Sequence, residues 1–203
     1  MIIVYSLSFN TINATDTFIN PPTNYLYIPP PTIELSINEL NRLKKGKRIY
    51  KDVADKNKTE QVVVFRIDAS KEKIWHTILS YNSYPDWIKN VDHTQIYRQK
   101  DQHYYVDFLV GHWLLGKFRY SVVHYLSNDS WMKWQLDDKK SADFTLSIGY
   151  WKIIEAANEP GKHDVFYSAN FQFKEPRSEY IRKKGIKAGL KQASIWLPRE
   201  AQK

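Results

Sequence analysis

Residues 63–91 constrain the fold most, because a strand, a capped helix and an aromatic turn follow one another there without a break. Residues 62–67 alternate between two faces with the period of a β-strand. Ser70 follows as a helix N-cap, and Glu72 supports that start from the first turn. The short helix carries one apolar stripe, formed by Ile74, Trp75, Ile78 and Leu79. This helix is therefore expected to cover an apolar surface.

The chain restarts after this helix with Tyr-Pro-Asp-Trp-Ile, where Pro85 suits the first turn of a second short helix. An extended segment ending in Asp-Ala, an apolar-Trp helix and then Tyr-Pro-x-Trp-Ile resembles the START and Bet v 1-like (SRPBCC) superfamily. This group includes START lipid-transfer domains, polyketide cyclases and Coq10-type quinone-binding proteins. The matching residues are Asp68, Ala69, Ile74, Trp75, Leu79, Tyr84, Pro85, Trp87 and Ile88.

Later segments agree with this resemblance in order and spacing, namely residues 134–137, 149–151, 165–167 and Pro176 ahead of a closing helix. It covers about residues 60–200 and implies an α+β helix-grip fold. In that fold a curved antiparallel β-sheet wraps around a long C-terminal helix and leaves a hydrophobic cavity. We expect the START/Bet v 1-like domain to occupy residues 33–203, behind an extended, proline-rich N-terminal arm at residues 1–32.

The strand pattern predicts an antiparallel meander with short turns. The expected strands are residues 48–54, 59–67, 94–99, 104–110, 117–126, 131–136, 144–154 and 165–173. Alternation places one set of side chains on the concave face: Tyr104, Val106, Phe108, Phe118, Tyr120, Val122, His124, Met132, Trp134, Leu136, Tyr167, Ala169, Phe171 and Phe173. In residues 144–154 both registers are apolar, so alternation assigns neither face.

The closing helix is expected over about residues 177–196, with Pro198 as its stop. Its plausible buried stripe is Ile181, Ile186, Leu190, Ala193 and Leu197. Gly185 and Gly189 each disfavour a helix by about 1 kcal/mol relative to Ala. Two explanations stay open: the helix packs closely on the sheet at these glycines, or it leaves volume there for a ligand.

Composition excludes several kinds of site. The absence of cysteine rules out disulfides, Cys-ligated zinc, iron–sulfur clusters and thiol nucleophiles. Aromatic residues make up 15% of the chain, enough for a broad aromatic lining or simply for a β-rich core. The net charge of +8 fits a solvated basic exterior or contact with an anionic surface. Nucleic acid is not the expected partner.

The first residues leave the compartment open between cytoplasmic and periplasmic or secreted. Residues 1–9 are apolar but too short to span a bilayer, and they lack the basic start of a secretory signal. They fit a signal segment missing its front, with residues 12–14 as a weak cleavage site, or a terminus docked on the sheet.

No catalytic motif is present, since the sequence lacks a Gly-rich phosphate loop, HExxH and GxSxG, and its six histidines have no compact metal-ligand spacing. We assign no catalytic residue, no metal ligand and no cofactor. His124 lies in an otherwise apolar register, where it could act as an acid or base or be a satisfied core histidine. The expected ligand-binding residues are Trp75, Tyr84, Trp87, Tyr104, Phe108, Phe118, Tyr120, His124, Trp134, Tyr167, Phe171, Ile186 and Leu190.

Three functions fit these observations. The preferred one is binding or transfer of a hydrophobic small molecule such as a lipid, sterol, quinone or polyketide-like compound, without catalysis. The second is a cyclase, dehydratase or hydrolase acting on a polyketide-like or aromatic substrate. The third is an interaction module of a ribosome-associated or toxin–antitoxin kind, supported only by the basic charge. Lysines on the closing helix also suggest transient contact with an anionic membrane.

Overall fold

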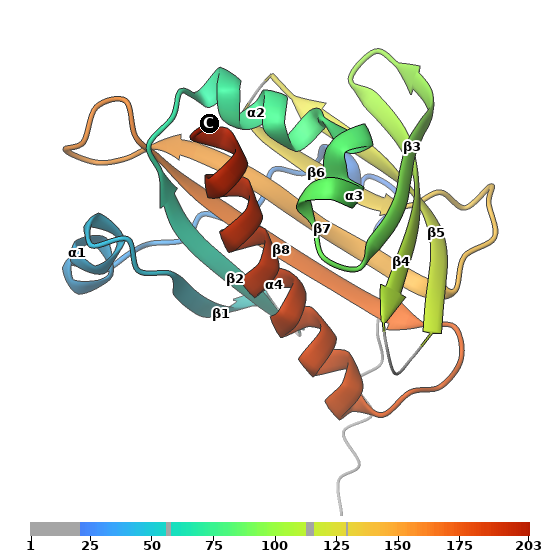
Figure 1. Cartoon of the computed structure of the whole chain (residues 1–203). Helices are drawn as coiled ribbons and strands as arrows, with labels where there is room; N and C mark the ends of the chain where they lie inside the picture. Colours follow the sequence, from blue (N-terminus) through green and yellow to red (C-terminus); the bar gives the residue numbers. More distant parts are fainter. Residues whose placement is uncertain (1–20, 56–57, 113–115, 129) are drawn as a thin grey trace, which may run out of the picture.

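Eight antiparallel strands form one sheet in the computed structural model, in the order β1-β2-β8-β7-β6-β5-β4-β3 (Figure 1). The structure describes residues 21–55, 58–112, 116–128 and 130–203, so the predicted signal segment and cleavage site lie outside the described residues. The strands are β1 (Ile49–Asp55), β2 (Lys58–Ile67), β3 (Val91–Lys100), β4 (His103–His112), β5 (Gly116–Ser127), β6 (Trp131–Leu136), β7 (Phe144–Glu155) and β8 (His163–Phe173). All eight predicted strands are present, each within a few residues of its predicted bounds.

The long C-terminal helix α4 (Glu179–Ala201) runs across one face of this sheet, and the helices α2 (Lys71–Leu79) and α3 (Tyr84–Trp87) lie near its C-terminal part (Figure 1). Helix α4 packs against β2, β8 and α2. A single core cluster joins it to the sheet, with Ile186, Leu190 and Leu197 against residues such as Val63 and Val165. The predicted α+β helix-grip fold is therefore confirmed.

The stretch from β2 to α3 forms as the sequence predicts. Ser70 Oγ accepts a hydrogen bond from Lys73 N at 3.2 Å, which caps α2. The apolar stripe of α2 is buried at Ile74, Trp75 and Ile78. A 3-10 turn, η2 (Tyr81–Ser83), then leads directly into α3. This connection carries the chain from β2 at one side of the sheet to β3 at its far edge.

Helix α4 extends beyond its predicted end, because Pro198 lies inside it and the helix continues to Ala201. The prediction of a stop at Pro198 was wrong. Proline removes the N–H that would bond to the carbonyl four residues earlier, which is that of Ser194. Arg48 Nε donates to this carbonyl at 3.2 Å instead. Leu197 and Ala201 are buried, and this burial also stabilises the last turn of α4 against fraying.

The convex face of the sheet is covered by the segment before β1. Helix α1 (Ile37–Lys44) begins with the predicted capping box between Ser36 and Glu39. Beneath it lies a second apolar cluster, made of Leu43, Ile49, Val62, Val64, Tyr150 and Phe166. Further upstream, the 3-10 turn η1 (Tyr25–Tyr27) lies on β5 and β6.

Contacts of the arm fix this turn to the sheet. Lys133 Nζ lies 4.0 Å from the centre of the Tyr25 ring, and the Tyr27 ring packs on Tyr125 with centres 4.9 Å apart. Tyr25 donates to the carbonyl of Gly149 at 3.4 Å. The proline-rich segment stays outside the sheet, as predicted, but it is not extended throughout, because residues 25–27 form a 3-10 turn. The proposed boundary at residue 32 remains a prediction.

Candidate ligand-binding cavity

Two joined chambers lie between α4 and the concave face of the sheet. The inner chamber has a volume of about 260 Å³ and the outer chamber about 620 Å³. Both are lined by Val91, Val110, Tyr120, Ser147, Phe171, Gly185, Gly189 and Gln192, so they form one continuous cavity. The outer chamber adjoins Tyr180 and Lys184 near the N-terminal end of α4, and both of these side chains are exposed.

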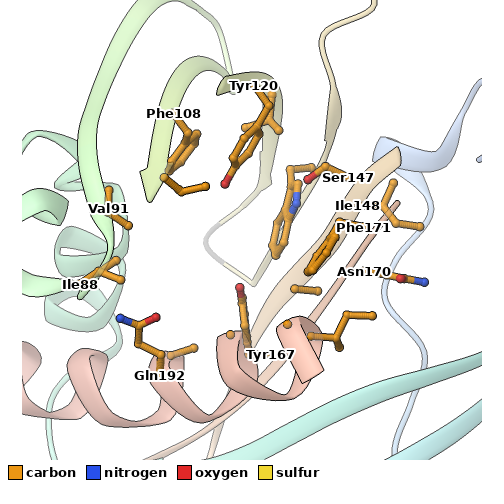
Figure 2. A pocket seen from close by; sticks show the side chains of 18 of the residues that line it. Ile88, Val91, Phe108, Tyr120, Ser147, Ile148, Tyr167, Asn170, Phe171 and Gln192 are labelled. Atoms are coloured by element: carbon orange, nitrogen blue, oxygen red, sulfur yellow. The ribbon is translucent and has the colours of Figure 1, made fainter. Parts of the chain in front are cut away.

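Aromatic rings form a large part of the inner wall. Phe108 and Tyr120 stack with ring planes 6° apart and centres 5.1 Å apart. On the opposite side Tyr167 packs on Trp151, with centres 4.0 Å apart, and lies 5.8 Å from Trp134. Figure 2 shows the hydroxyls of Tyr120 and Tyr167 pointing into the space between these two walls. Figure 2 also shows the amide of Gln192 directed into the cavity from α4.

Glycines shape this cavity in three ways. A Cβ at Gly149 would lie 2.2 Å from Trp134 Cζ2, so this glycine lets the indole lie on the neighbouring strand as part of the wall. A Cβ at Gly185 would lie 2.7 Å from Phe171 Cζ, which means that α4 approaches the sheet closely there. A Cβ at Gly189 meets nothing within 4 Å. Close packing on the sheet therefore explains Gly185, and volume left for a ligand explains Gly189.

His124 is the one histidine in the lining among the described residues. Its side chain is buried, and its Nδ1 atom has no hydrogen-bond partner. Burial lowers the pKa of His124 to about 3, so the imidazole is neutral at physiological pH. Rings of Tyr81, Phe108 and Trp134 surround it at centre distances of 5.3, 6.4 and 5.7 Å. A core histidine with its ring nitrogens hydrogen-bonded was one expectation from the sequence. In the structure, Nδ1 of His124 lacks a partner.

Other buried hydroxyls nearby are satisfied within the protein. Tyr84 donates to the carbonyl of Ile78, and Tyr81 donates to Met132 Sδ at 3.7 Å. Tyr120 and Tyr167 make no hydrogen bond in the part of the chain that the structure describes. Desolvation by burial raises the pKa of both these tyrosines, so their hydroxyls stay protonated.

Most of the predicted ligand-binding residues do line this cavity. They are Tyr84, Phe108, Phe118, Tyr120, His124, Trp134, Tyr167, Phe171 and Ile186. Four others do not: Trp75 and Leu190 are buried in the core, Tyr104 packs beside Tyr81, and Trp87 stacks on Trp196. Tyr104 was predicted from strand alternation, Trp75 and Leu190 from helix stripes, and Trp87 from its place in the segment after the first helix. None of these signals can separate packed core from cavity wall.

Sequence reasoning missed several lining residues, including Ser147, Trp151, Gln192 and Trp196. Gln192 Nε2 donates to Lys89 O at 2.7 Å, and Arg199 donates to Trp87 O at 2.8 Å, so two bonds hold α4 to the end of α3 and the residues that follow it. Gly189 was the available signal, because a glycine inside a helix marks a place where a side chain is disfavoured or unnecessary.

The remaining polar candidates do not gather into a site. His103 and His112 begin and end β4, so they are at opposite ends of one strand. The Asp137 to Lys140 segment forms the predicted charged turn, in which Asp137 accepts from Tyr97 and Lys140 pairs with Asp107 at 2.8 Å. Across the described ranges, no three His, Asp or Glu side chains are placed to hold a metal ion. No helix in those ranges is long and apolar enough to cross a membrane.

Comparison with known proteins links this geometry to a fold. No family model matches the sequence, and no curated protein matches it. Human StAR-related lipid transfer protein 5 superposes with a TM-score of 0.58 at 7% identity, covering 76% of this chain and 81% of that one. The START superfamily protein from Mycobacterium smegmatis gives 0.58 at 15% identity, covering 70% of this chain and 95% of that one.

The Zhui aromatase/cyclase from Streptomyces sp. R1128 gives a TM-score of 0.57 at 9% identity, covering 77% of this chain and 93% of that chain. These likenesses do not distinguish the polyketide cyclase branch from the Coq10-type branch. They agree with the eight-stranded antiparallel sheet and the long C-terminal helix α4. The chain therefore has the START/Bet v 1-like helix-grip fold.

Proposed function

We propose that this protein binds and carries a hydrophobic small molecule in the cavity between its sheet and α4. The observation that carries the proposal is the continuous cavity itself, with a lining dominated by aromatic and aliphatic side chains. A core that only needed stability would fill such a volume, because packing voids are unfavourable. Lipid transfer proteins among the structural neighbours support the same class of ligand.

The inner chamber favours binding over catalysis. Its lining contains no Asp, Glu, Lys or Arg among the described residues. A histidine with a pKa of about 3 is a weak general base near neutral pH. The cyclase, dehydratase or hydrolase alternative rests on neighbours described as aromatase/cyclases and on the tyrosine hydroxyls. In that case a protonated tyrosine hydroxyl would be the acid, and the described lining of the inner chamber offers no carboxylate or lysine as the base.

Ligand exchange is proposed to occur at an anionic membrane through α4. Lys183, Lys184, Lys187 and Lys191 are all exposed on this helix, and Lys184 lies at the wall of the outer chamber. Tyr180, which is 66% exposed, borders the same chamber. Basic residues near a membrane surface each contribute about 1 kcal/mol of attraction to anionic lipids. The third alternative, an interaction module, still rests only on net charge.

A cavity-filling variant tests the proposal. Gly189→Trp should abolish binding of the neutral fluorescent probe N-phenyl-naphthylamine, because the new side chain enters the space that both chambers share. Ile195→Trp is the matched control, since Ile195 is exposed on the same helix and lines neither chamber. Native mass spectrometry with extraction of bound lipid should identify the natural ligand. If Gly189→Trp bound the probe as tightly as Ile195→Trp does, the proposal would be contradicted.

A further inference from the structure

Two tyrosine hydroxyls that point into the inner chamber lack partners in the part of the chain that the structure describes, although most of the surrounding wall is apolar. They are the hydroxyls of Tyr120 and Tyr167 (Figure 2). Buried polar groups are normally hydrogen-bonded, and each unsatisfied one is unfavourable. One of them comes from β5 and the other from β8 across the chamber. A bound molecule could satisfy both at once.

The chemistry of these groups selects an uncharged partner. Tyrosine hydroxyls both donate and accept hydrogen bonds. A hydroxyl on the ligand can likewise donate and accept. A carboxylate or phosphate would be placed among neutral groups with no cation in the described lining, which is unfavourable in a buried site.

The outer chamber has the opposite character. Its described lining contains two charged residues, Lys89 and Lys184, and no acid. The Lys184 ammonium lies 4.6 Å from the centre of the Tyr180 ring at the edge of this chamber. Asp92, close to the lining residue Gly111, is already paired with Lys117 at 2.8 Å. The outer chamber is therefore suited to a negative charge.

We infer that the ligand is an amphiphile bound end-on, with a neutral hydroxyl against the Tyr120 and Tyr167 hydroxyls and an anionic group beside Lys184. This inference rests on the proposed function and adds the polarity of the ligand at each end. The ligand class is thus a hydroxylated lipid or polycyclic acid whose hydroxyl and acid groups are at opposite ends of an apolar body.

Matched amphiphiles test each end separately by displacing N-phenyl-naphthylamine. ω-Hydroxypalmitate has both polar ends, palmitate lacks the hydroxyl, and the methyl ester of ω-hydroxypalmitate lacks the charge. Wild type should bind ω-hydroxypalmitate about fivefold more tightly than palmitate, the effect of one net hydrogen bond. That preference should disappear in the double variant Tyr120→Phe, Tyr167→Phe and persist in Tyr105→Phe, which changes a tyrosine outside the lining.

The charged end is tested in the same way. Lys184→Met should weaken binding of ω-hydroxypalmitate severalfold and leave its methyl ester unaffected. Lys191→Met, on the same helix but outside both linings, should change neither. If wild type binds the probe but ω-hydroxypalmitate displaces it no better than palmitate, the inference is wrong and the proposed function stands. If wild type does not bind the probe at all, the proposed function itself is contradicted, and the inference that rests on it is contradicted as well.

Discussion

The guanidinium of Arg48 donates a hydrogen bond to the main-chain carbonyl of Ser194, with Nε and O 3.2 Å apart. This carbonyl has no partner within its helix because the residue four positions later is Pro198. Arg48 precedes β1, so the bond joins the edge of the sheet to the last turns of α4. It explains how a helix that closes the cavity can continue through a proline.

A double-mutant cycle should detect this relationship. Arg48→Met is expected to lower the free energy of unfolding by about 1 kcal/mol in wild type, as for loss of one hydrogen bond. In the Pro198→Ala background the loss should be smaller, because the restored main-chain N–H then bonds to the Ser194 carbonyl. Urea unfolding of the four proteins measures both losses. Equal losses in the two backgrounds would show that Arg48 acts elsewhere.

The two glycines of α4 should respond differently to alanine. Gly189→Ala is expected to raise the free energy of unfolding by about 1 kcal/mol, because helix propensity improves and the new Cβ meets no atom. Gly185→Ala should gain less or lose stability, since its Cβ would force the Phe171 ring to move. Repeating Gly185→Ala in a Phe171→Ala background should recover the gain. Thermal and urea unfolding compare these variants.

Acid should destabilise the protein through His124. In the folded state burial lowers the pKa of His124 to about 3, whereas in the unfolded chain it is about 6.5. The unfolded chain therefore takes up a proton first as pH falls. The stability that this neutral imidazole provides is complete above about pH 6.5 and declines by about 1.4 kcal/mol per pH unit down to about pH 3.

His124→Phe removes this titration and keeps a ring of similar shape in the wall. Between about pH 6 and pH 4 the free energy of unfolding of wild type should fall more steeply than that of the variant. Carboxylates with lowered pKa, such as Glu39 and Glu179, act in the same direction but are present in both proteins. Parallel stability curves over this range would show that His124 is not buried in its neutral form.

Sequence patterns predicted the elements better than the cavity. Residues 144–154 could not be assigned a face because both registers are apolar, and the structure shows that both faces of β7 are covered: Trp151 and Ile153 belong to the main core cluster, and Tyr150 to the cluster beneath α1. A register shift between Phe144 and Leu146 also breaks the period of two at the start of the strand, so that Phe144 and then Ser147 line the cavity. Helix α4 passes through Pro198 because Arg48, distant in sequence, replaces the missing bond.

The distinction between core and cavity wall needs three-dimensional information. Leu190 and Gly189 are neighbours in α4, yet the first is buried in the core and the second borders both chambers. Trp134 was predicted correctly on the concave face, but its position in the wall depends on Gly149 in the adjacent strand. A side chain on the concave face either packs against a neighbour or borders empty volume. Residue pairs on adjacent strands, such as Trp134 and Gly149, and the path of α4 decide which of the two occurs.

Membrane contact through α4 gives the last prediction. Neutralising Lys183, Lys184, Lys187 and Lys191 to Gln should weaken binding to vesicles containing phosphatidylserine by several kcal/mol at most, at about 1 kcal/mol per charge. The free energy of unfolding should change little, because these lysines are exposed. High salt should reduce binding of wild type through screening. Vesicle flotation at low and high salt measures this.

The control for this experiment has the same net charge but changes another face. Arg42, Lys44, Lys45 and Lys47 are exposed at the end of α1 and after it, on the convex side of the sheet. If α4 is the membrane-facing surface, replacing these four by Gln should leave most of the flotation intact. Equal losses in the two fourfold variants would mean that overall charge alone attracts the vesicles. Unchanged flotation in both would leave α4 as a structural lid over the cavity, and ligand exchange would then need no membrane.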